Sequence, residues 1–246
     1  MNRIMPSIYP MLYSFFCVTG LLKLEPFLTQ VDAVIAAGRT RISILGFGTE
    51  VGKLSFEDRA TVLTLMCNRI AGRCQLMVTV YGDTSDEQVA FANIVMDHCV
   101  SWLVLQPPSL HCNEEDLSLH VSKIMSNGPF AVGIQNGRCG LEFPDSLRDG
   151  VVEIVPGIDT ADKHEQTHAL FASGNLTGAD TEHSQISPII SFIVQGILHF
   201  LTYGRTIAAL RLGIDVGGSR QPHLSATPFG RSIAKRFATQ LGPLAY

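Results

Sequence analysis

The sequence predicts an α/β fold in which parallel strands alternate with covering helices. Short apolar runs and amphipathic segments follow one another through the first half of the chain, which is the pattern of successive β-α-β units. The apolar runs are hydrophobic on both faces, as strands of a helix-covered parallel sheet are. The chain has 246 residues, close to the roughly 250 residues of one TIM-type (β/α)8 barrel. These three observations predict a single domain of that barrel type.

Six apolar runs have the length and composition of strands, whereas a closed barrel of this type needs eight. The runs are Ile8–Phe16, Ile42–Gly46, Gln75–Tyr81, Trp102–Leu105, Phe130–Gln135 and Val151–Val155. Only fourteen residues separate Asn136 from Val151, which leaves room for one short helix around Asp145–Arg148. A parallel crossover takes a dozen or more residues, so this link is minimal. We therefore expect a barrel shortened to about six strands.

Helical patterns fill the intervals and the last third of the chain. Ser55 and Asp58 form a near capping box at the start of a helix that Gly72 ends. Asp159 is placed to cap a further helix, and Thr227 with Pro228 opens the last one. The other predicted helices are Pro26–Ala37, Asp86–His98, Glu114–Met125, Thr160–Ser173 and Ile186–Leu212. We expect an incomplete barrel over residues 1–174 and a helical carboxyl-terminal extension over 175–246, packed on the barrel.

Composition narrows the function classes. The net charge is −4 without Lys/Arg clusters, which argues against nucleic acid and anionic membranes as partners. The six cysteines show no C-x-x-C spacing and indicate reduced thiols. Pro6 and Pro10 interrupt the apolar amino terminus and no small-residue cleavage site follows, so we read this segment as a strand rather than a signal peptide. We expect a cytoplasmic protein with no membrane span, cofactor or metal.

A glycine-rich loop, Gly46-Phe47-Gly48-Thr49-Glu50, follows the second predicted strand. The carboxyl ends of parallel strands are where α/β proteins build their sites, so this loop is the first candidate. Glu50 either orients backbone amides there or is a simple carboxylate on the approach to a helix. Tyr81 and Asp83, at the end of the third strand, lie at the same edge, although a turn aspartate is also commonly structural.

Three other interpretations of these motifs remain open. A dinucleotide-binding loop requires G-x-G-x-x-G, but Gly52 comes one position late. A P-loop fits less well, because the glycine spacing is wrong and Leu54 replaces the hydroxyl residue after Lys53. His98-Cys99 and His111-Cys112 offer soft-metal ligands, but the close cysteine spacing of structural zinc sites is absent. We therefore favour a helix-end histidine and a buried thiol as the interpretation of each pair.

Five short motifs, taken in order, resemble one enzyme family. They are Ser14-Phe15-Phe16 with Gly20; Gly46–Glu50 with Leu54, Ser55, Glu57 and Arg59; Tyr81–Ser85; Gln135-Asn136; and Leu210–Ile214 with Arg220 and Pro222. In type and spacing they are similar to the motifs of the dihydrodipicolinate synthase and N-acetylneuraminate lyase family. The resemblance extends discontinuously from Ile8 to about Leu241. Asn136 looks joined directly to a segment that resembles the seventh and eighth strands of the family.

The resemblance implies a pyruvate-dependent lyase or aldolase that cleaves carbon–carbon or carbon–oxygen bonds through a Schiff base and forms homo-oligomers. It implies a small 2-oxo acid such as pyruvate as substrate. The residues it places at the substrate are Gly46, Phe47, Gly48, Thr49, Glu50 and Gln135. Phe47-Gly48 replace a threonine pair, and Gln135 replaces the tyrosine that relays protons in the family.

The resemblance implies that this chain lacks one segment of the family's barrel. In the family, that segment carries the Schiff-base lysine. The five lysines are Lys23, Lys53, Lys123, Lys163 and Lys235; by pattern, Lys53 lies in a loop and the others lie on helices or their approaches. No catalytic residue is therefore assignable. Two main hypotheses follow: a family lyase or aldolase, or a catalytically inactive barrel remnant with a binding or assembly role. A nucleotide-binding oxidoreductase is the third.

Overall fold

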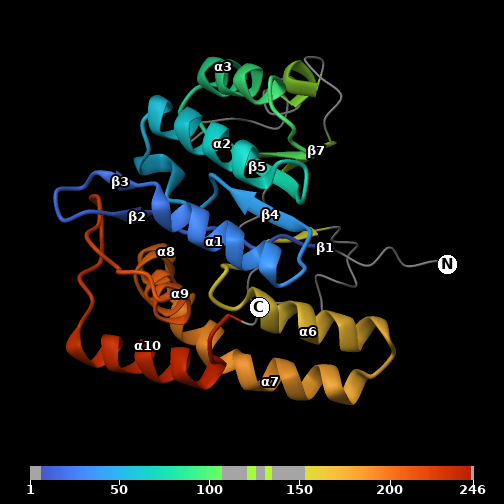
Figure 1. Ribbon diagram of the computed structural model, residues 1–246, viewed down its shortest axis with the longest axis vertical. Helices are drawn as coiled ribbons and strands as arrows, with labels where there is room; N and C mark the ends of the chain where they lie inside the picture. The colour runs from blue at the N-terminus through green and yellow to red at the C-terminus, as the bar shows by residue number, and fades with distance from the viewer. Residues whose placement is uncertain (1–6, 107–120, 126–130, 135–152, 245–246) are drawn as a thin grey trace.

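The computed structural model describes residues 7–106, 121–125, 131–134 and 153–244 (Figure 1). Its central sheet has four parallel strands in the order β4 (Arg41–Ile44), β5 (Gln75–Val80), β6 (Trp102–Leu105) and β7 (Ala131–Ile134). A second parallel pair joins β1 (Ser7–Ile8) to β8 (Glu153–Ile154). Met11 forms parallel bridges to both Ser43 and Gly157. The described parallel strands thus follow the order β8-β1-β4-β5-β6-β7.

The predicted α/β fold is confirmed, and each predicted strand run overlaps a parallel strand, the first of them only at Ile8. The shortening of the barrel and the junction after Asn136 stay predictions. Gln135, the junction and the short helix expected at Asp145–Arg148 lie outside the described residues.

The prediction of one continuous strand over Ile8–Phe16 is wrong. β1 ends at Ile8, and β2 (Phe15–Phe16) pairs antiparallel with β3 (Leu22–Lys23) in a separate hairpin. Pro10 has no N–H to donate to a strand ladder, and Gly20 turns the hairpin with a φ of 84°. An apolar run shows that a segment is buried, but it does not show which partner the backbone pairs with.

Helices α1 (Glu25–Ala36), α2 (Phe56–Ile70) and α3 (Ser85–Met96) cover the sheet next to the strands that they connect. Ser55 and Asp58 complete the predicted capping box of α2. That helix ends at Ala71, which adopts a left-handed φ of 46°, one residue before the predicted stop at Gly72. Of the predicted helix Glu114–Met125, residues 121–125 are described and are helical.

The carboxyl-terminal half of the described chain consists of helices on the far side of α1 from α2 and α3 (Figure 1). In order they are α6 (Ala161–Ala172), α7 (Leu176–Ile193), α8 (Ile197–His199), a π-helix η2 (Phe200–Gly204), α9 (Arg205–Leu212) and α10 (Pro228–Leu241). Thr227 caps α10 as predicted, since its side chain accepts a hydrogen bond from the Gly230 N–H. α6 and α7 pack against each other, across the predicted domain boundary at residue 174.

Two predictions in this half are wrong. The stretch Ile186–Leu212 is not one helix, because α7 begins at Leu176 and the chain bends by 107° before continuing into α8 and α9. Asp159 does not cap α6; Thr160 occupies the cap position, and the Asp159 carboxyl instead accepts a hydrogen bond from Tyr13. Both errors arise because contacts between distant residues outweigh the local pattern.

No single described helix is long and apolar enough to cross a membrane. The two arms of the bent pair, Leu176–Ile193 and Ile197–Leu212, reach that length and composition only when taken together.

Candidate functional site

The loop Gly46–Glu50 is tied firmly to the chain that follows β1. The Thr49 hydroxyl donates to the Leu12 carbonyl at 2.8 Å and accepts from the Leu45 N–H at 3.0 Å. The Ser14 hydroxyl donates to the Thr49 carbonyl at 2.5 Å. Leu45 and Glu50 have φ values of 60° and 55°, which are uncommon for residues with side chains. These hydrogen bonds hold the loop in that conformation.

Met11 fills the space beside the two glycines of the loop. A Cβ atom added to Gly46 or to Gly48 would lie closer than 3.0 Å to the Met11 side chain. Met11 itself is buried. A side chain at either position would therefore have to displace Met11, and Gly48 offers no hydroxyl where the resemblance expects a threonine. Phe47, between them, is half-buried.

The Glu50 carboxylate pairs with two cations. Its side chain is 2% exposed, and its Oε1 accepts from an Arg205 guanidinium nitrogen at 2.9 Å. Its Oε2 accepts from Lys53 Nζ at 2.5 Å. Neither sequence interpretation of Glu50 anticipated these ion pairs, because Arg205 is 155 residues away. The carboxylate joins the β4 loop to the carboxyl-terminal helices.

Arg205 is a residue of this site that the sequence reasoning missed. It follows η2 directly and is only 4% exposed. Besides Glu50, it donates to the Ser219 hydroxyl at 2.5 Å. Burial lowers the pKa of Arg205, and the charge of Glu50 opposes that shift. One signal was available: Arg205 is the first Asp, Glu, Lys or Arg after Glu182 in an otherwise apolar stretch, and an isolated buried cation requires a partner.

Tyr13 and Asp159 form a second buried pair at the same edge. The Tyr13 hydroxyl donates to Asp159 Oδ1 at 2.8 Å, and both residues are fully buried. Burial raises the pKa of Asp159 to about 7, against the opposing effects of the Tyr13 hydrogen bond and Arg211. Burial, together with the charge of Asp159, also holds the pKa of Tyr13 well above its ordinary value.

Arg220 brings three of the sequence motifs together. Its Nε donates to the Gly20 carbonyl at 2.8 Å, and a terminal nitrogen donates to the Lys53 carbonyl and to Asp58 Oδ2, both at 2.7 Å. The guanidinium also lies 5.0 Å from the centre of the Phe16 ring. The hairpin motif, the loop motif and the tail motif are therefore in contact around this one side chain.

All five lysines lie in the described part of the chain, and none is on a described parallel strand. Lys53 is in the 3₁₀ turn η1 (Val51–Lys53) and its side chain is 11% exposed. Lys23 is on β3 and pairs with Asp215 at 2.9 Å, which corrects the prediction that it lies on a helix or its approach. The others are on helices, as predicted: Lys123, Lys163 and Lys235.

The remaining candidates have structural contacts or are not described. The Tyr81 hydroxyl donates to Asp83 Oδ1 at 3.2 Å, and Arg59 donates to the Tyr81 carbonyl at 2.7 Å, so this turn is held by its own residues. Within the described residues, no group of three or more His, Cys, Asp or Glu side chains could hold a metal ion. His111-Cys112 lies outside the described residues.

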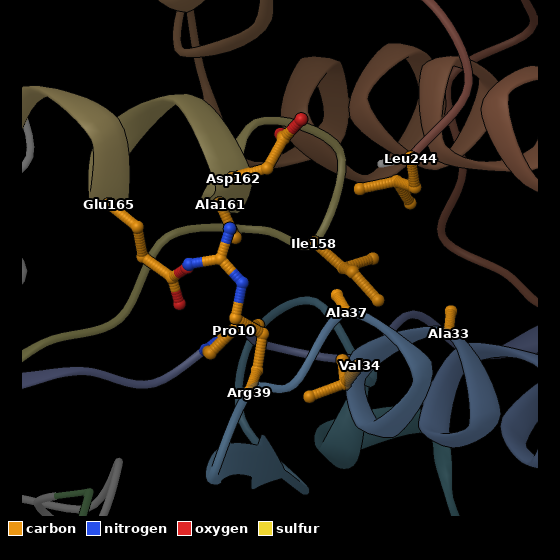
Figure 2. Close-up of a pocket in the computed structure, with 10 residues that line it drawn as sticks. All are labelled: Pro10, Ala33, Val34, Ala37, Arg39, Ile158, Ala161, Asp162, Glu165 and Leu244. Atoms are coloured by element: carbon orange, nitrogen blue, oxygen red, sulfur yellow. The ribbon is translucent and has the colours of Figure 1, made fainter. Parts of the chain in front are cut away.

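A shallow pocket lies away from the loop, between α1, α6 and Leu244 (Figure 2). Its walls are mostly apolar, with an Arg39–Glu165 ion pair and Asp162 among them. Arg39 precedes the amino end of β4, so the pocket is not at the carboxyl ends of the strands. It is separate from the site around Glu50.

The fold is shared with solved enzymes across almost the whole chain. Ruminococcus gnavus sialic acid aldolase matches with a TM-score of 0.86 and 14% identity, covering 96% of this chain and 97% of that enzyme. Dihydrodipicolinate synthase from Bacillus clausii matches with a TM-score of 0.85 and 10% identity, over 97% and 98%. A catalytic lysine mutant of the Ruminococcus gnavus aldolase gives 0.82 and 14%, over 98% and 97%.

No family model and no curated protein sequence matches the chain. At these low identities the similarity defines the fold. The chain has the α/β fold of sialic acid aldolases and dihydrodipicolinate synthases, with a polar cluster of Glu50, Lys53, Arg205, Tyr13 and Asp159 at the carboxyl ends of its strands.

Proposed function

We propose that this chain is a member of the dihydrodipicolinate synthase and N-acetylneuraminate lyase family that has lost Schiff-base catalysis and serves a binding or assembly role. The position of the five lysines carries this proposal. A Schiff base needs a neutral, desolvated amine inside a pocket. Lys53, the lysine beside the candidate loop, is engaged in an ion pair with the buried Glu50 carboxylate.

The contacts of the loop support the same proposal. The Thr49 hydroxyl is engaged by Leu45 and Leu12, and Met11 packs against Gly46 and Gly48. The nearest carboxylate-binding cation, Arg205, already holds Glu50. A small 2-oxo acid bound by Gly46–Glu50 and Gln135 would have to displace these interactions.

Intact mass after incubation with pyruvate and borohydride tests this proposal. We expect no covalent adduct from a sample that unfolds cooperatively on heating, whereas an active family aldolase treated in parallel gives one. An adduct that maps to a single lysine would overturn the loss of Schiff-base chemistry. Analytical ultracentrifugation of the same sample tests the assembly role, for which we expect a homo-oligomer.

A second function, a lyase or aldolase acting on a small 2-oxo acid through a substitute amine, is favoured by one observation. Lys53 is next to the candidate loop and its side chain is mostly buried. If Lys53 were that amine, Lys53→Arg would abolish adduct formation, whereas Lys163→Arg on α6 would leave it unchanged. The variant Glu50→Gln, which removes the ion-pair partner of Lys53, would then increase the adduct.

A further inference from the structure

Tyr13 lies where three segments of the chain meet at the carboxyl ends of β1 and β8. Its hydroxyl is so close to Gly157, after β8, and to Gly204, at the end of η2, that a Cβ atom at either glycine would lie closer than 3.0 Å to it. Its ring also packs on Phe200, at the start of η2, with 5.4 Å between ring centres. The π-helix is therefore seated directly on the Tyr13–Asp159 pair.

The surroundings of Asp159 favour its neutral form. Its Oδ1 accepts from Tyr13, and its Oδ2 has no hydrogen-bond partner among the described atoms. Arg211, from α9, donates to the Asp159 backbone carbonyl at 2.5 Å, but its charge is matched by Asp162 of α6 at 2.6 Å. Arg205, behind Tyr13, is matched by Glu50. Each nearby cation already has a carboxylate, so ionised Asp159 would be an uncompensated buried charge.

We propose that the Tyr13–Asp159 pair is a proton-operated latch that fastens η2 and α9 to the carboxyl ends of β1 and β8. With Asp159 protonated, the segment stays seated. When Asp159 loses its proton, the carboxylate gains stability by reaching water, and this favours local opening of the segment. Arg205 belongs to the same segment, so opening withdraws it from Glu50 and releases the loop Gly46–Glu50.

The direction of the pH dependence follows from the raised pKa of Asp159. Its folded value of about 7 lies above the ordinary 3.8, so the folded state binds the proton more tightly than the open state does. The latch is therefore strongest below pH 3.8, and its stability is lost as the pH rises towards 7. A single linked proton changes the opening equilibrium by up to about tenfold per pH unit.

Hydrogen–deuterium exchange between pH 5 and 8, corrected for the intrinsic exchange rate, tests the latch. In the wild-type protein we expect protection of residues 200–212 to fall by up to about tenfold per pH unit up to pH 7. Asp159→Asn keeps the acceptor for Tyr13 but cannot ionise, so the slope disappears. The control Asp180→Asn makes the same change at an exposed site on α7 and keeps the slope.

Tyr13→Phe provides a second test if Asp159→Asn does not fold. Removing the hydroxyl takes away the side-chain donor that Asp159 has among the described residues, which destabilises the ionised form further. The pH range over which protection is lost should then move upward. Retention of the slope in Asp159→Asn, a downward or absent shift in Tyr13→Phe, or the absence of a slope in residues 200–212 of the wild type would each overturn the proposal.

Discussion

The β4 loop and the β8–α6 connection each bury one carboxyl group, but in opposite electrostatic settings. Glu50 is bound by two cations, Arg205 and Lys53. Asp159 is bound by one neutral phenol, and burial raises its pKa to about 7. Burial alone therefore does not determine whether an acid is charged. The partners supplied by distant segments determine it, and each site predicts a different response to losing its carboxyl.

The largest expected effect is at Glu50. Glu50→Gln leaves Arg205 and Lys53 buried without their counter-charge, and breaking such a pair typically costs about 3–5 kcal/mol. Chemical denaturation at pH 7 measures this loss. If Glu50→Gln lowered the free energy of unfolding by less than the loss of an exposed ion pair does, the cluster would be solvated. The comparison with Asp159 would then be wrong.

Gly204→Ala is expected to cost about 1–3 kcal/mol, because the added methyl group overlaps the Tyr13 hydroxyl. Removing that hydroxyl by Tyr13→Phe should relieve part of the cost, so the double variant should lose less than the sum of the single variants. Thermal unfolding of the wild type, the two single variants and the double variant measures this double-mutant cycle. Strict additivity would show that Tyr13 does not contact the π-helix.

Asp159→Asn is expected to change the pH dependence of global stability more than stability at any one pH. A raised folded pKa means that wild-type stability declines between about pH 4 and 7, by up to about 1.4 kcal/mol per pH unit from this group. The variant should lack that decline and be the more stable protein at pH 8. Urea titrations across this range measure it. If the stability of the wild type and that of Asp159→Asn changed with pH by the same amount, the raised pKa would be contradicted.

The smallest effect is expected at an exposed ion pair, Arg69–Asp32, whose side chains are 46% and 44% exposed. Asp32→Asn should cost less than about 1 kcal/mol, as surface pairs typically do, and the cost should decrease in high salt. Denaturant midpoints in low and high salt provide the measurement. If Asp32→Asn lowered stability as much as Glu50→Gln does, solvent exposure would not determine how much an ion pair contributes.

Predictions that rest on neighbouring residues agree with the structure. Ser55 and Asp58 cap α2, and Thr227 caps α10, because a cap needs only a side chain three residues from an N–H. The strand runs Gln75–Tyr81 and Trp102–Leu105 contain β5 and β6, and the run Ile42–Gly46 overlaps β4, because buried parallel strands need continuous apolar runs.

Predictions that needed a distant partner failed or were not made. Asp159 was assigned to a cap but binds Tyr13, 146 residues away. The apolar run around Arg205 gives no indication that this residue binds Glu50. The assignment of Gly46–Glu50 and Gln135 to substrate stays a prediction, and its test is the binding and capture of a 2-oxo acid.

The sequence by itself determined the α/β class, the positions of the strands β4 to β7 and the glycine-rich loop after β4. Only the tertiary structure decided how the loop is held, which acids are paired with cations and where the apolar stretch 186–212 bends. The physical reason is the distance along the chain over which each interaction acts. Hydrophobic periodicity and capping act over a few residues, whereas the charge state of a buried acid depends on whichever segments the fold places beside it.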